Sequence, residues 1–185
     1  MAFNPDKCEM IRITNKRNII DGSYFIHGQT LKQTNKAKYL GGTLDNTLSW
    51  NNHIDHTAKK ANTTTAFLRR NLSHCPRDIK ATCYKSLVRP QLEYASSVWD
   101  PHTQSNINKL EKVQRRAARF CTCDYRHTSS VTAMMQELNW ETLESRRQQT
   151  KAVMMYRVIN HLVDIRVHLL VPTGVHTRGH ANRFL

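Results

Sequence analysis

The spacing of apolar and polar residues changes its period near residue 48. Before that point, short stretches alternate between apolar and polar positions, and proline, aspartate and glycine residues separate them. We therefore expect short strands that form a small antiparallel sheet, with Gly28-Gln29 as a tight connection. Such a sheet has open edges and one face that needs cover. The expected strands are residues 7–14, 23–27 and 38–44.

From residue 49 the apolar residues recur at helical spacing. Ser49 is a candidate N-cap for a helix over residues 50–72. Pro76 suits the first turn of a second helix, Pro90 should kink or split it, and Asp100-Pro101 should end it. The apolar face of the first helix is Ile54, Ala58, Ala61, Thr65, Leu68 and Leu72. That of the second is Ile79, Cys83, Leu87, Leu92, Ala95 and Val98.

The clearest helical pattern covers residues 104–121. Its apolar stripe is Ile107, Leu110, Val113, Ala117 and Cys121. A cationic stripe on roughly the opposite side is Lys109, Lys112, Arg116 and Arg119. After a break at residues 122–128, Ser129 should cap a short helix that ends near residue 139. A last long helix is expected over residues 141–163, before a flexible tail.

These patterns predict an α+β fold, with a small antiparallel β-sheet or hairpin followed by a mostly α-helical bundle. We divide the chain into residues 1–48, residues 49–121, helices over 122–171 and a tail over 172–185. The three tryptophans, Trp50, Trp99 and Trp140, fall at expected helix boundaries, where we expect them to anchor packing.

The chain carries a formal net charge of +14, and 21 of its 28 basic residues lie after residue 50. A basic surface favours nucleic acid as a partner, with an anionic membrane surface second and a solvated surface without a specific partner as the alternative. Glu111 is the only acid in the helix over 104–121, so pairing within the helix cannot neutralise its cationic stripe. Arg69-Arg70 and, with the same weaker argument, Arg146-Arg147 are further candidates for phosphate contacts.

The five cysteines are odd in number and irregularly spaced, which argues against a disulfide framework. Cys121, Cys123 and His127, with His74-Cys75, raise the question of zinc. Their spacing fits none of the common ligand patterns, and Cys121 belongs to an apolar stripe, so no metal site is expected. No apolar stretch approaches the ~20 residues of a membrane span, and the start has no apolar signal core, so we expect an intracellular protein of the cytoplasm or nucleus.

Three segments of this sequence resemble the reverse transcriptases of non-LTR retrotransposons, in particular those of the CR1- and jockey-like LINE group. They are Phe3-Asn4-Pro5-Asp6-Lys7-Cys8-Glu9, Lys38-Tyr39-Leu40-Gly41 and residues 68–117. Within the third, Cys83-Tyr84-Lys85-Ser86-Leu87-Val88-Arg89-Pro90 and Leu92-Glu93-Tyr94-Ala95 are especially similar. The order and spacing of the segments make this chain resemble the C-terminal part of such an enzyme.

The resemblance implies a right-hand polymerase. Lys7 matches a palm lysine near the phosphates of the incoming nucleotide, which is the pyrophosphate side, and its role here is expected to be vestigial. Lys38, Tyr39, Leu40 and Gly41 match the primer-grip hairpin, although Tyr39 and Leu40 could also be strand-core residues. Residues 1–48 would then be the end of the palm and residues 49–121 the thumb. The family has an aliphatic residue after this motif where the chain has Gly42, which predicts a less stiff hairpin.

The family's catalytic Asp-Asp pair has no counterpart here, because no two acidic residues are adjacent. We interpret Asp21, Asp45, Asp78 and Asp100 as caps and turn formers. Mg²⁺ belongs to the parent polymerase and no cofactor is expected in this chain. The sequence predicts a catalytically incomplete part of an RNA-directed DNA polymerase that grips template–primer nucleic acid through Arg69, Arg70, Lys109, Lys112, Arg116 and Arg119.

The expected partners are RNA, DNA or an RNA–DNA hybrid, together with the missing part of the polymerase, and no membrane. Two alternatives stay open at this point. The chain could be a non-enzymatic basic helical module for nucleic acid, co-opted from a retroelement. It could also be a basic interaction bundle with no nucleic-acid role, which would bind heparin and structured RNA equally.

Overall fold

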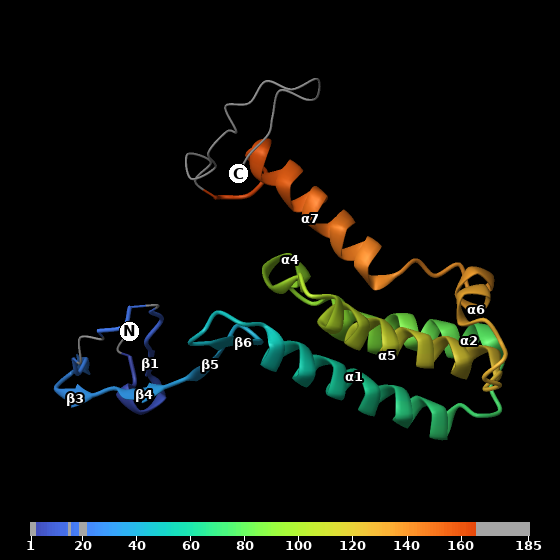
Figure 1. Cartoon of the computed structure of the whole chain (residues 1–185), viewed down its shortest axis with the longest axis horizontal. Coiled ribbons are helices and arrows are strands. Elements are labelled where there is room, and N and C mark those ends of the chain that lie inside the picture. Colours follow the sequence, from blue (N-terminus) through green and yellow to red (C-terminus); the bar gives the residue numbers. More distant parts are fainter. Residues whose placement is uncertain (1–2, 15, 19–21, 166–185) are drawn as a thin grey trace.

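The computed structural model describes residues 3–14, 16–18 and 22–165. Small two-stranded sheets precede a mostly helical part (Figure 1), which confirms the expected α+β fold class. Asp21 and the expected flexible tail beyond residue 172 lie outside the described residues. No helix within the described ranges combines the length and the apolar character that a membrane crossing requires.

The N-terminal part consists of strand pairs rather than the single antiparallel sheet that we expected. Strands β1 and β4 pair in parallel, whereas β2–β3 and β5–β6 are antiparallel hairpins. The elements are the 3-10 turn η1 (Pro5–Lys7), β1 (Glu9–Ile11), β2 (Phe25–Ile26), β3 (Gln29–Thr30), β4 (Lys32–Thr34), β5 (Lys36–Tyr39) and β6 (Gly42–Asp45).

Both hairpins turn through two residues with positive φ, the conformation of a type I′ turn. His27 and Gly28 have φ of 50° and 78°, and Leu40 and Gly41 have φ of 46° and 83°. The expectation of one strand over residues 38–44 was therefore wrong, since this stretch spans both strands of the β5–β6 hairpin and its turn. A two-residue turn leaves the alternation of side chains unbroken, so the pattern alone does not reveal it.

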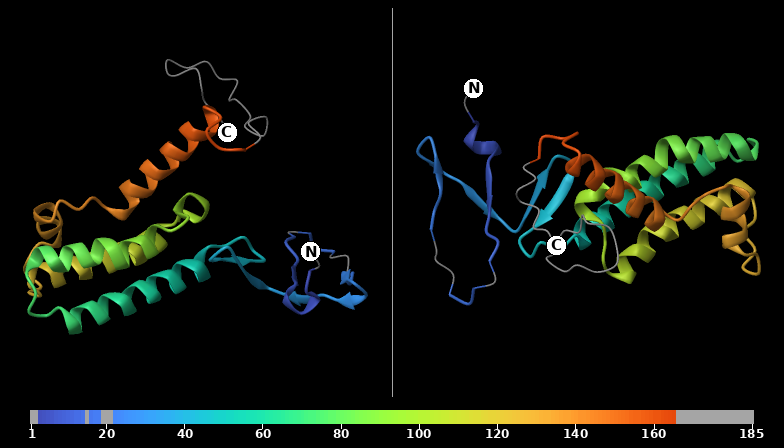
Figure 2. Two further views of the ribbon diagram at one scale, coloured as in Figure 1. Left: turned by 180° about the vertical axis from the view of Figure 1, so that it is seen from behind. Right: turned by 90° about the horizontal axis from the view of Figure 1, so that it is seen from above.

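The helical part begins with two long helices that lie side by side in the views of Figures 1 and 2, with shorter helical segments between them in sequence. Its elements are α1 (Asn51–Asn71), α2 (Arg77–Cys83), the π-helical segment η2 (Tyr84–Val88), α3 (Arg89–Glu93), α4 (Ser96–Trp99), α5 (Gln104–Thr122), α6 (Val131–Glu137) and α7 (Leu143–Ile159).

Helices α1 and α5 bury the faces that their sequences predict. The α1 face from Ile54 to Leu68 is buried, with Leu72 packed against it, and the whole expected apolar stripe of α5 is buried. The cap of α1 differs by one residue, because Trp50 is the N-cap and the Ser49 hydroxyl accepts from the N–H of Asn51. Likewise Pro76 is the N-cap of α2 rather than a first-turn residue.

The expected face of the second helix was partly wrong, since Leu92 is buried and Cys83 packs against the core but other positions differ. Ile79 and Leu87 are 48% and 50% exposed, while Tyr84 and Val88 are fully buried. The helix splits before Pro90, as expected, but it does so through η2, and a π-helical turn rotates the chain out of the 3.6-residue register. Lys80 is buried as well, with its ammonium donating to the Cys123 Sγ (2.9 Å) over the ring of Phe120.

Polar bonds hold α1 and α5 parallel and in register. Asn51, Asp55 and Asn62 of α1 each bond a residue 54 or 55 positions later, namely Asn106, Lys109 and Arg116. A constant offset of this kind requires two helices that run in the same direction. The long helices therefore present matching rows of side chains along their whole shared length.

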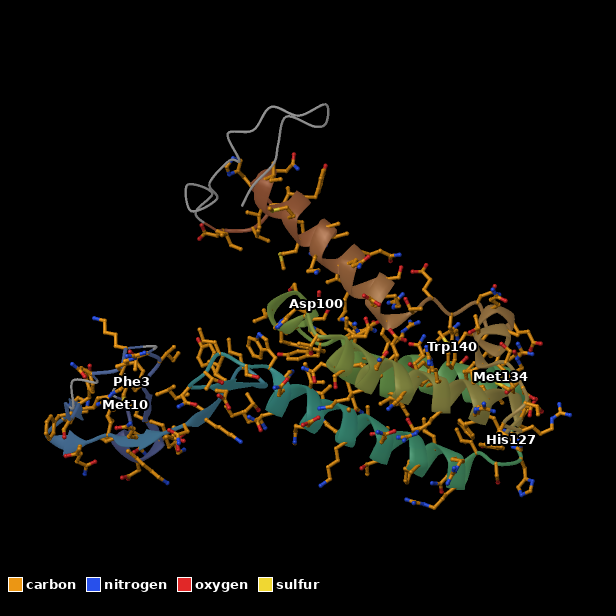
Figure 3. All side chains as sticks on the ribbon, in the orientation of Figure 1. Phe3, Met10, Asp100, His127, Met134 and Trp140 are labelled. Atoms are coloured by element: carbon orange, nitrogen blue, oxygen red, sulfur yellow. The ribbon has the colours of Figure 1, made fainter. Side chains whose placement is uncertain are left out.

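Helix α6 and the start of α7 close the same core. Ser130, rather than the expected Ser129, caps α6 by accepting from the N–H of Ala133. Met134 and Trp140 lie at the end of the molecule that carries α6 (Figure 3). Asp100 lies near the N-terminal half of α7 (Figure 3). Trp99 and Trp140 are buried and Trp50 packs against the core, so the tryptophans anchor packing at helix boundaries as expected.

Candidate nucleic-acid interface

A groove between α1 and α5 gathers most of the predicted basic residues. It consists of two adjoining hollows of about 590 and 350 Å³ that share Asn62, Ala66 and Arg116. We call this surface the α1–α5 groove. It is lined by six basic residues and one acid, namely Lys59, Arg69, Lys109, Lys112, Arg116, Arg119 and Asp55.

The groove follows from the helical spacing on both sides. On α5, the basic residues recur at intervals of three and four, so they share one face. On α1, Asp55, Lys59, Asn62, Ala66 and Arg69 recur at the same intervals. Because the two helices are parallel, these stripes face each other along the groove. The 14 residue steps from Asp55 to Arg69 correspond to about 21 Å of helix.

The basic residues of the groove are held to different degrees. Lys109 pairs with Asp55 (2.6 Å), and Arg116 donates to the Asn62 Oδ1 (3.0 Å). Within the described part of the chain, the ammonium groups of Lys59 and Lys112 have neither a hydrogen-bond nor an ion-pair partner. Their ammonium groups therefore lose no internal contact when they bind an external anion.

The cationic stripe is not neutralised from within its own helix, as expected. Glu111 points into the core and accepts the N–H of Glu144 (2.9 Å), and its burial raises the pKa of its carboxyl group. Partial neutralisation comes instead from Asp55 on the neighbouring helix. The groove keeps an excess of positive charge, since Asp55 is the only acid among the described residues that line it.

The structure separates the paired arginines that the sequence suggested. Arg69 lines the groove, whereas Arg70 is exposed and lines neither hollow. Arg146 pairs with Glu93, and Arg147 is buried with its Nε donating to Asp100 (2.8 Å). The interpretation of Arg146-Arg147 as a phosphate-binding pair was therefore wrong, because both serve to dock α7. Asp100, which we took for a cap or turn former, is the partner of Arg147 in this contact.

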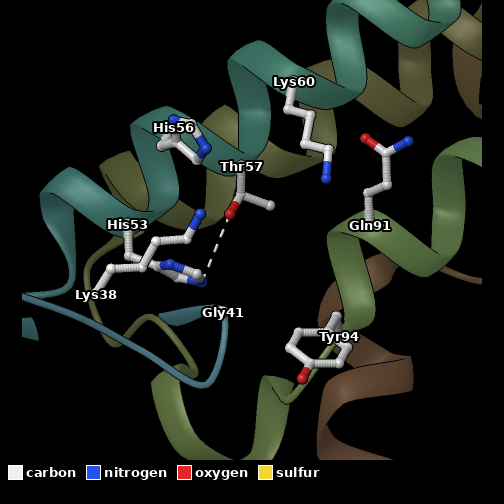
Figure 4. Close-up of a pocket in the computed structure, with 8 residues that line it drawn as sticks. All are labelled: Lys38, Gly41, His53, His56, Thr57, Lys60, Gln91 and Tyr94. Carbon is white, nitrogen blue, oxygen red and sulfur yellow. Dashed lines mark hydrogen bonds between the residues drawn. The ribbon is translucent and has the colours of Figure 1, made fainter. Parts of the chain in front are cut away.

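The β5–β6 hairpin forms a separate hollow, of about 290 Å³, against α1 and α3 (Figure 4). Lys38 and Gly41 contribute from the hairpin, and His53, His56, Thr57, Lys60, Gln91 and Tyr94 contribute from the helices. The Tyr94 hydroxyl donates to the carbonyl of Leu40 (3.2 Å), and the N–H of Thr43 donates to the His53 Nδ1 (3.3 Å). These bonds fix the hairpin at the start of α1.

The alternative of Tyr39 and Leu40 as strand-core residues was wrong. Their side chains are 66% and 75% exposed. Tyr39 lines a further hollow of about 530 Å³ together with Lys38 and Lys7. The structure thus brings Lys7 to the side of the hairpin that carries Lys38 and Tyr39. A Cβ would also fit at Gly42, where it would be in ordinary contact with the carbonyl of Tyr39.

The residues that the structure describes do not fit a metal ion. Among the described residues, no three His, Cys, Asp or Glu side chains gather to hold one, so neither Mg²⁺ nor Zn²⁺ has a donor set there. Asp45 instead forms a turn, with its carboxylate accepting from the Thr47 N–H and hydroxyl, and these bonds lower its pKa. Burial raises the pKa of the Cys121 thiol to about 12.

The sequence did not identify two residues of the groove that matter for its chemistry. Lys59 could have been found, because it belongs to the polar stripe on α1 that faces the cationic stripe of α5. Tyr125 could not, because it lies in the loop after α5, where no periodicity places a side chain. Both depend on which faces of the two long helices meet.

The chain is similar in sequence to curated RNA-directed DNA polymerases of mobile elements. It is 30% identical over 122 residues, 64% of this chain, to the enzyme of the mobile element jockey from Drosophila funebris. It is 27% identical over 129 residues to the probable enzyme of transposon X-element from Drosophila melanogaster. A third, from transposon BS of Drosophila melanogaster, is 31% identical over 122 residues.

This similarity is distant homology. The chain spans only about 13% or 14% of the length of these relatives. No family model matches the sequence, and no solved structure matches the fold. This homology agrees with the resemblance to retrotransposon reverse transcriptases found in the sequence.

Proposed function

We propose that this chain corresponds to the end of the palm and the thumb of a retrotransposon reverse transcriptase, and that it grips template–primer nucleic acid. Residues 1–48 would carry the primer-grip hairpin and residues 49–121 the thumb. The α1–α5 groove is the observation that carries the proposal. Its six basic residues and single acid lie along about 21 Å of parallel helices, which suits a row of phosphates.

The hairpin extends this interface toward the start of α1. Lys38 lines the hollows on both sides of the hairpin, and its side chain is exposed, as are those of Tyr39 and Leu40. Exposed apolar and basic groups at a turn can contact a nucleic-acid end, whereas buried ones cannot. In this proposal, the hairpin holds the primer end while the groove tracks the duplex.

In the proposal the chain supplies binding and not phosphoryl transfer. A two-metal mechanism needs clustered carboxylates, and the sequence has no adjacent acidic pair. Lys7 therefore has no metal-bound nucleotide to act on within this chain. The carboxylates would come from the rest of a polymerase, which is the expected protein partner.

The test is the affinity for an RNA–DNA hybrid, measured by fluorescence anisotropy at several salt concentrations. About four phosphate contacts predict an affinity loss of roughly 100-fold between about 50 and 200 mM salt. The double variant Lys59→Gln with Lys112→Gln should weaken binding and reduce the slope of log affinity against log salt by roughly 2, because two phosphate contacts are removed.

The matched control is Lys85→Gln with Arg157→Gln, which removes the same charge from exposed positions outside the groove. This control should keep most of the affinity and of the salt slope. Binding that does not change with salt would overturn the proposal. Equal losses in the two double variants would show that net charge, and not the groove, attracts the nucleic acid.

A further inference from the structure

The two ends of the α1–α5 groove differ in chemistry. The end near Asp55 is lined by charged, polar and small side chains, including Lys59, Lys109 and Lys112. The other end, the hollow of about 350 Å³, adds the aromatic residues Phe120 and Tyr125. We call it the Tyr125 hollow. Aromatic side chains do not bind phosphate groups. We therefore expect this end of the groove to contact a different part of a ligand.

Tyr125 is exposed, and the loop that carries it is fixed by hydrogen bonds. Its side chain is 54% exposed, although it lines the hollow together with the buried ring of Phe120. The loop that carries it is fixed on both sides of Tyr125, because the Arg119 guanidinium donates to the carbonyls of Asp124 (3.4 Å) and Arg126 (2.8 Å). The ion pair between Asp124 and Arg126 braces the same turn.

The chemistry of the Tyr125 hollow matches a single nucleotide. Aromatic side chains stack on the faces of bases, and guanidinium groups bind the adjoining phosphates. Here Arg69, Arg116 and Arg119 line the same hollow as the two aromatic residues. A volume of about 350 Å³ lies within the usual range of small-ligand sites, roughly 300–1,000 Å³.

A base pair in the interior of a duplex cannot reach this wall, because both of its faces are covered by its neighbours in the stack. We therefore propose that the Tyr125 hollow binds an unpaired nucleotide, with its base on Tyr125 and its phosphate on the surrounding arginines. The duplex would lie along the cationic end of the groove, and a single-stranded extension would enter at Tyr125. This inference rests on the proposed function and adds to it a preference for a duplex with a single-stranded overhang.

The experiment compares a blunt RNA–DNA hybrid with the same hybrid carrying a short single-stranded overhang, by fluorescence anisotropy on the full chain. The wild type should bind the overhang substrate roughly fivefold or more tightly, which is the gain expected for stacking one base. Tyr125→Leu should lose this preference and keep its affinity for the blunt hybrid. Tyr125→Phe, which keeps the ring, should retain it.

Tyr156→Leu is the matched control, since Tyr156 is similarly exposed (62%) but lies on α7 and lines neither hollow of the groove. It should retain the preference. An overhang whose first unpaired nucleotide is abasic keeps the phosphates and removes the base, and it should bind the wild type like the blunt hybrid. 2-Aminopurine at that nucleotide should be quenched by the wild type and not by Tyr125→Leu.

The possible failures are distinguishable. If the chain binds the blunt hybrid in a salt-dependent way but binds the overhang substrate no more tightly, this inference is wrong. The proposed function is then unaffected. A gain that survives Tyr125→Leu or the abasic overhang would also overturn it, because phosphates alone would then explain the preference. No binding of either substrate would overturn the proposed function itself.

Discussion

His53 lies where the β5–β6 hairpin meets the helices. Its ring is buried, with edge contacts to Trp50 and Trp99, and its Nδ1 accepts the N–H of Thr43. A ring nitrogen that accepts a hydrogen bond must be unprotonated. Burial, with a smaller effect of the neighbouring His56, lowers the pKa of His53 below its ordinary value of 6.5. The folded chain therefore favours the neutral ring.

We predict that the free energy of unfolding falls as the pH is lowered below 6.5. Because the pKa of His53 is lower in the folded state, the unfolded chain takes up the proton first, so acid favours unfolding. The contribution is complete above pH 6.5 and is lost as the pH falls through the lowered pKa. Its size should be on the order of one hydrogen bond, about 1 kcal/mol. Urea denaturation at a series of pH values measures it.

His53→Gln separates this residue from the other histidines. Glutamine stays neutral, so the variant should show a weaker dependence of stability on pH in this window. His127→Gln changes an exposed histidine in the loop after α5 and should behave like the wild type. A slope that is the same in all three proteins would show that His53 does not couple protonation to folding.

The β5–β6 hairpin combines a left-handed turn with a close contact to α3. Gly41 has a φ of +83°, and a Cβ built there would lie 3.1 Å from the Tyr94 Cε1. Gly28 occupies the equivalent position of the β2–β3 hairpin with a φ of +78°, but a Cβ there would meet nothing within 4 Å. The two glycines therefore share a backbone requirement and differ in what surrounds them.

We predict that Gly41→Ala costs more stability than Gly28→Ala. Both substitutions place a side chain at positive φ, which destabilises by about 1 kcal/mol. Gly41→Ala also displaces the Tyr94 ring and strains the bond of its hydroxyl to the carbonyl of Leu40. Chemical denaturation gives the difference, and Gly22→Ala, where φ is not left-handed and no atom is near, is the control. Equal effects at Gly41 and Gly28 would contradict a tight fit against Tyr94.

Elements with a regular period were predictable from sequence, and elements that interrupt the period were not. The buried faces of α1 and α5 follow a 3.6-residue repeat without interruption, so residues such as Ile54 and Leu110 were placed correctly. The π-helical turn η2 shifts the register by about one residue, so Leu87 was placed in the core where Val88 lies. The sequence signalled the cause, Pro90, but not the way in which the chain accommodates it.

The same limit applies to the candidate site. The cationic stripe of α5 was visible because Lys109 to Arg119 keep a helical spacing. The partner of that stripe depends on how α1 and α5 pack, which a single-helix pattern does not contain. Asp55 and Tyr125 therefore entered the site only through tertiary structure, whereas Lys59 belongs to a polar stripe of α1 that the sequence shows. Arg147 does not belong to the site, because it pairs with Asp100, which lies 47 residues away in the sequence. A helical pattern does not predict such a pairing.

At the scale of the whole molecule, the apolar core belongs to the helices. Among the described residues, every buried apolar side chain lies between Ile54 and Val158, and none precedes α1. The strands contribute instead through polar bonds to the helices. Those bonds are Thr43 to His53, Asn52 to Asp45, Lys36 to Asn52 and Tyr94 to Leu40. This distribution suggests that the helical part folds on its own.

We predict that a variant beginning at Ser49 unfolds in one cooperative thermal transition. The lost polar bonds are replaced by bonds to water, so the net cost should be about 2 kcal/mol, which lowers Tm by roughly 5–10 °C. Because the α1–α5 groove is intact, the variant should also bind an RNA–DNA hybrid with most of the wild-type salt dependence. Both results together would favour an independent helical module for nucleic acid. A broad, non-cooperative transition would instead show that the helices need the strands, or a partner polymerase, to reach their fold.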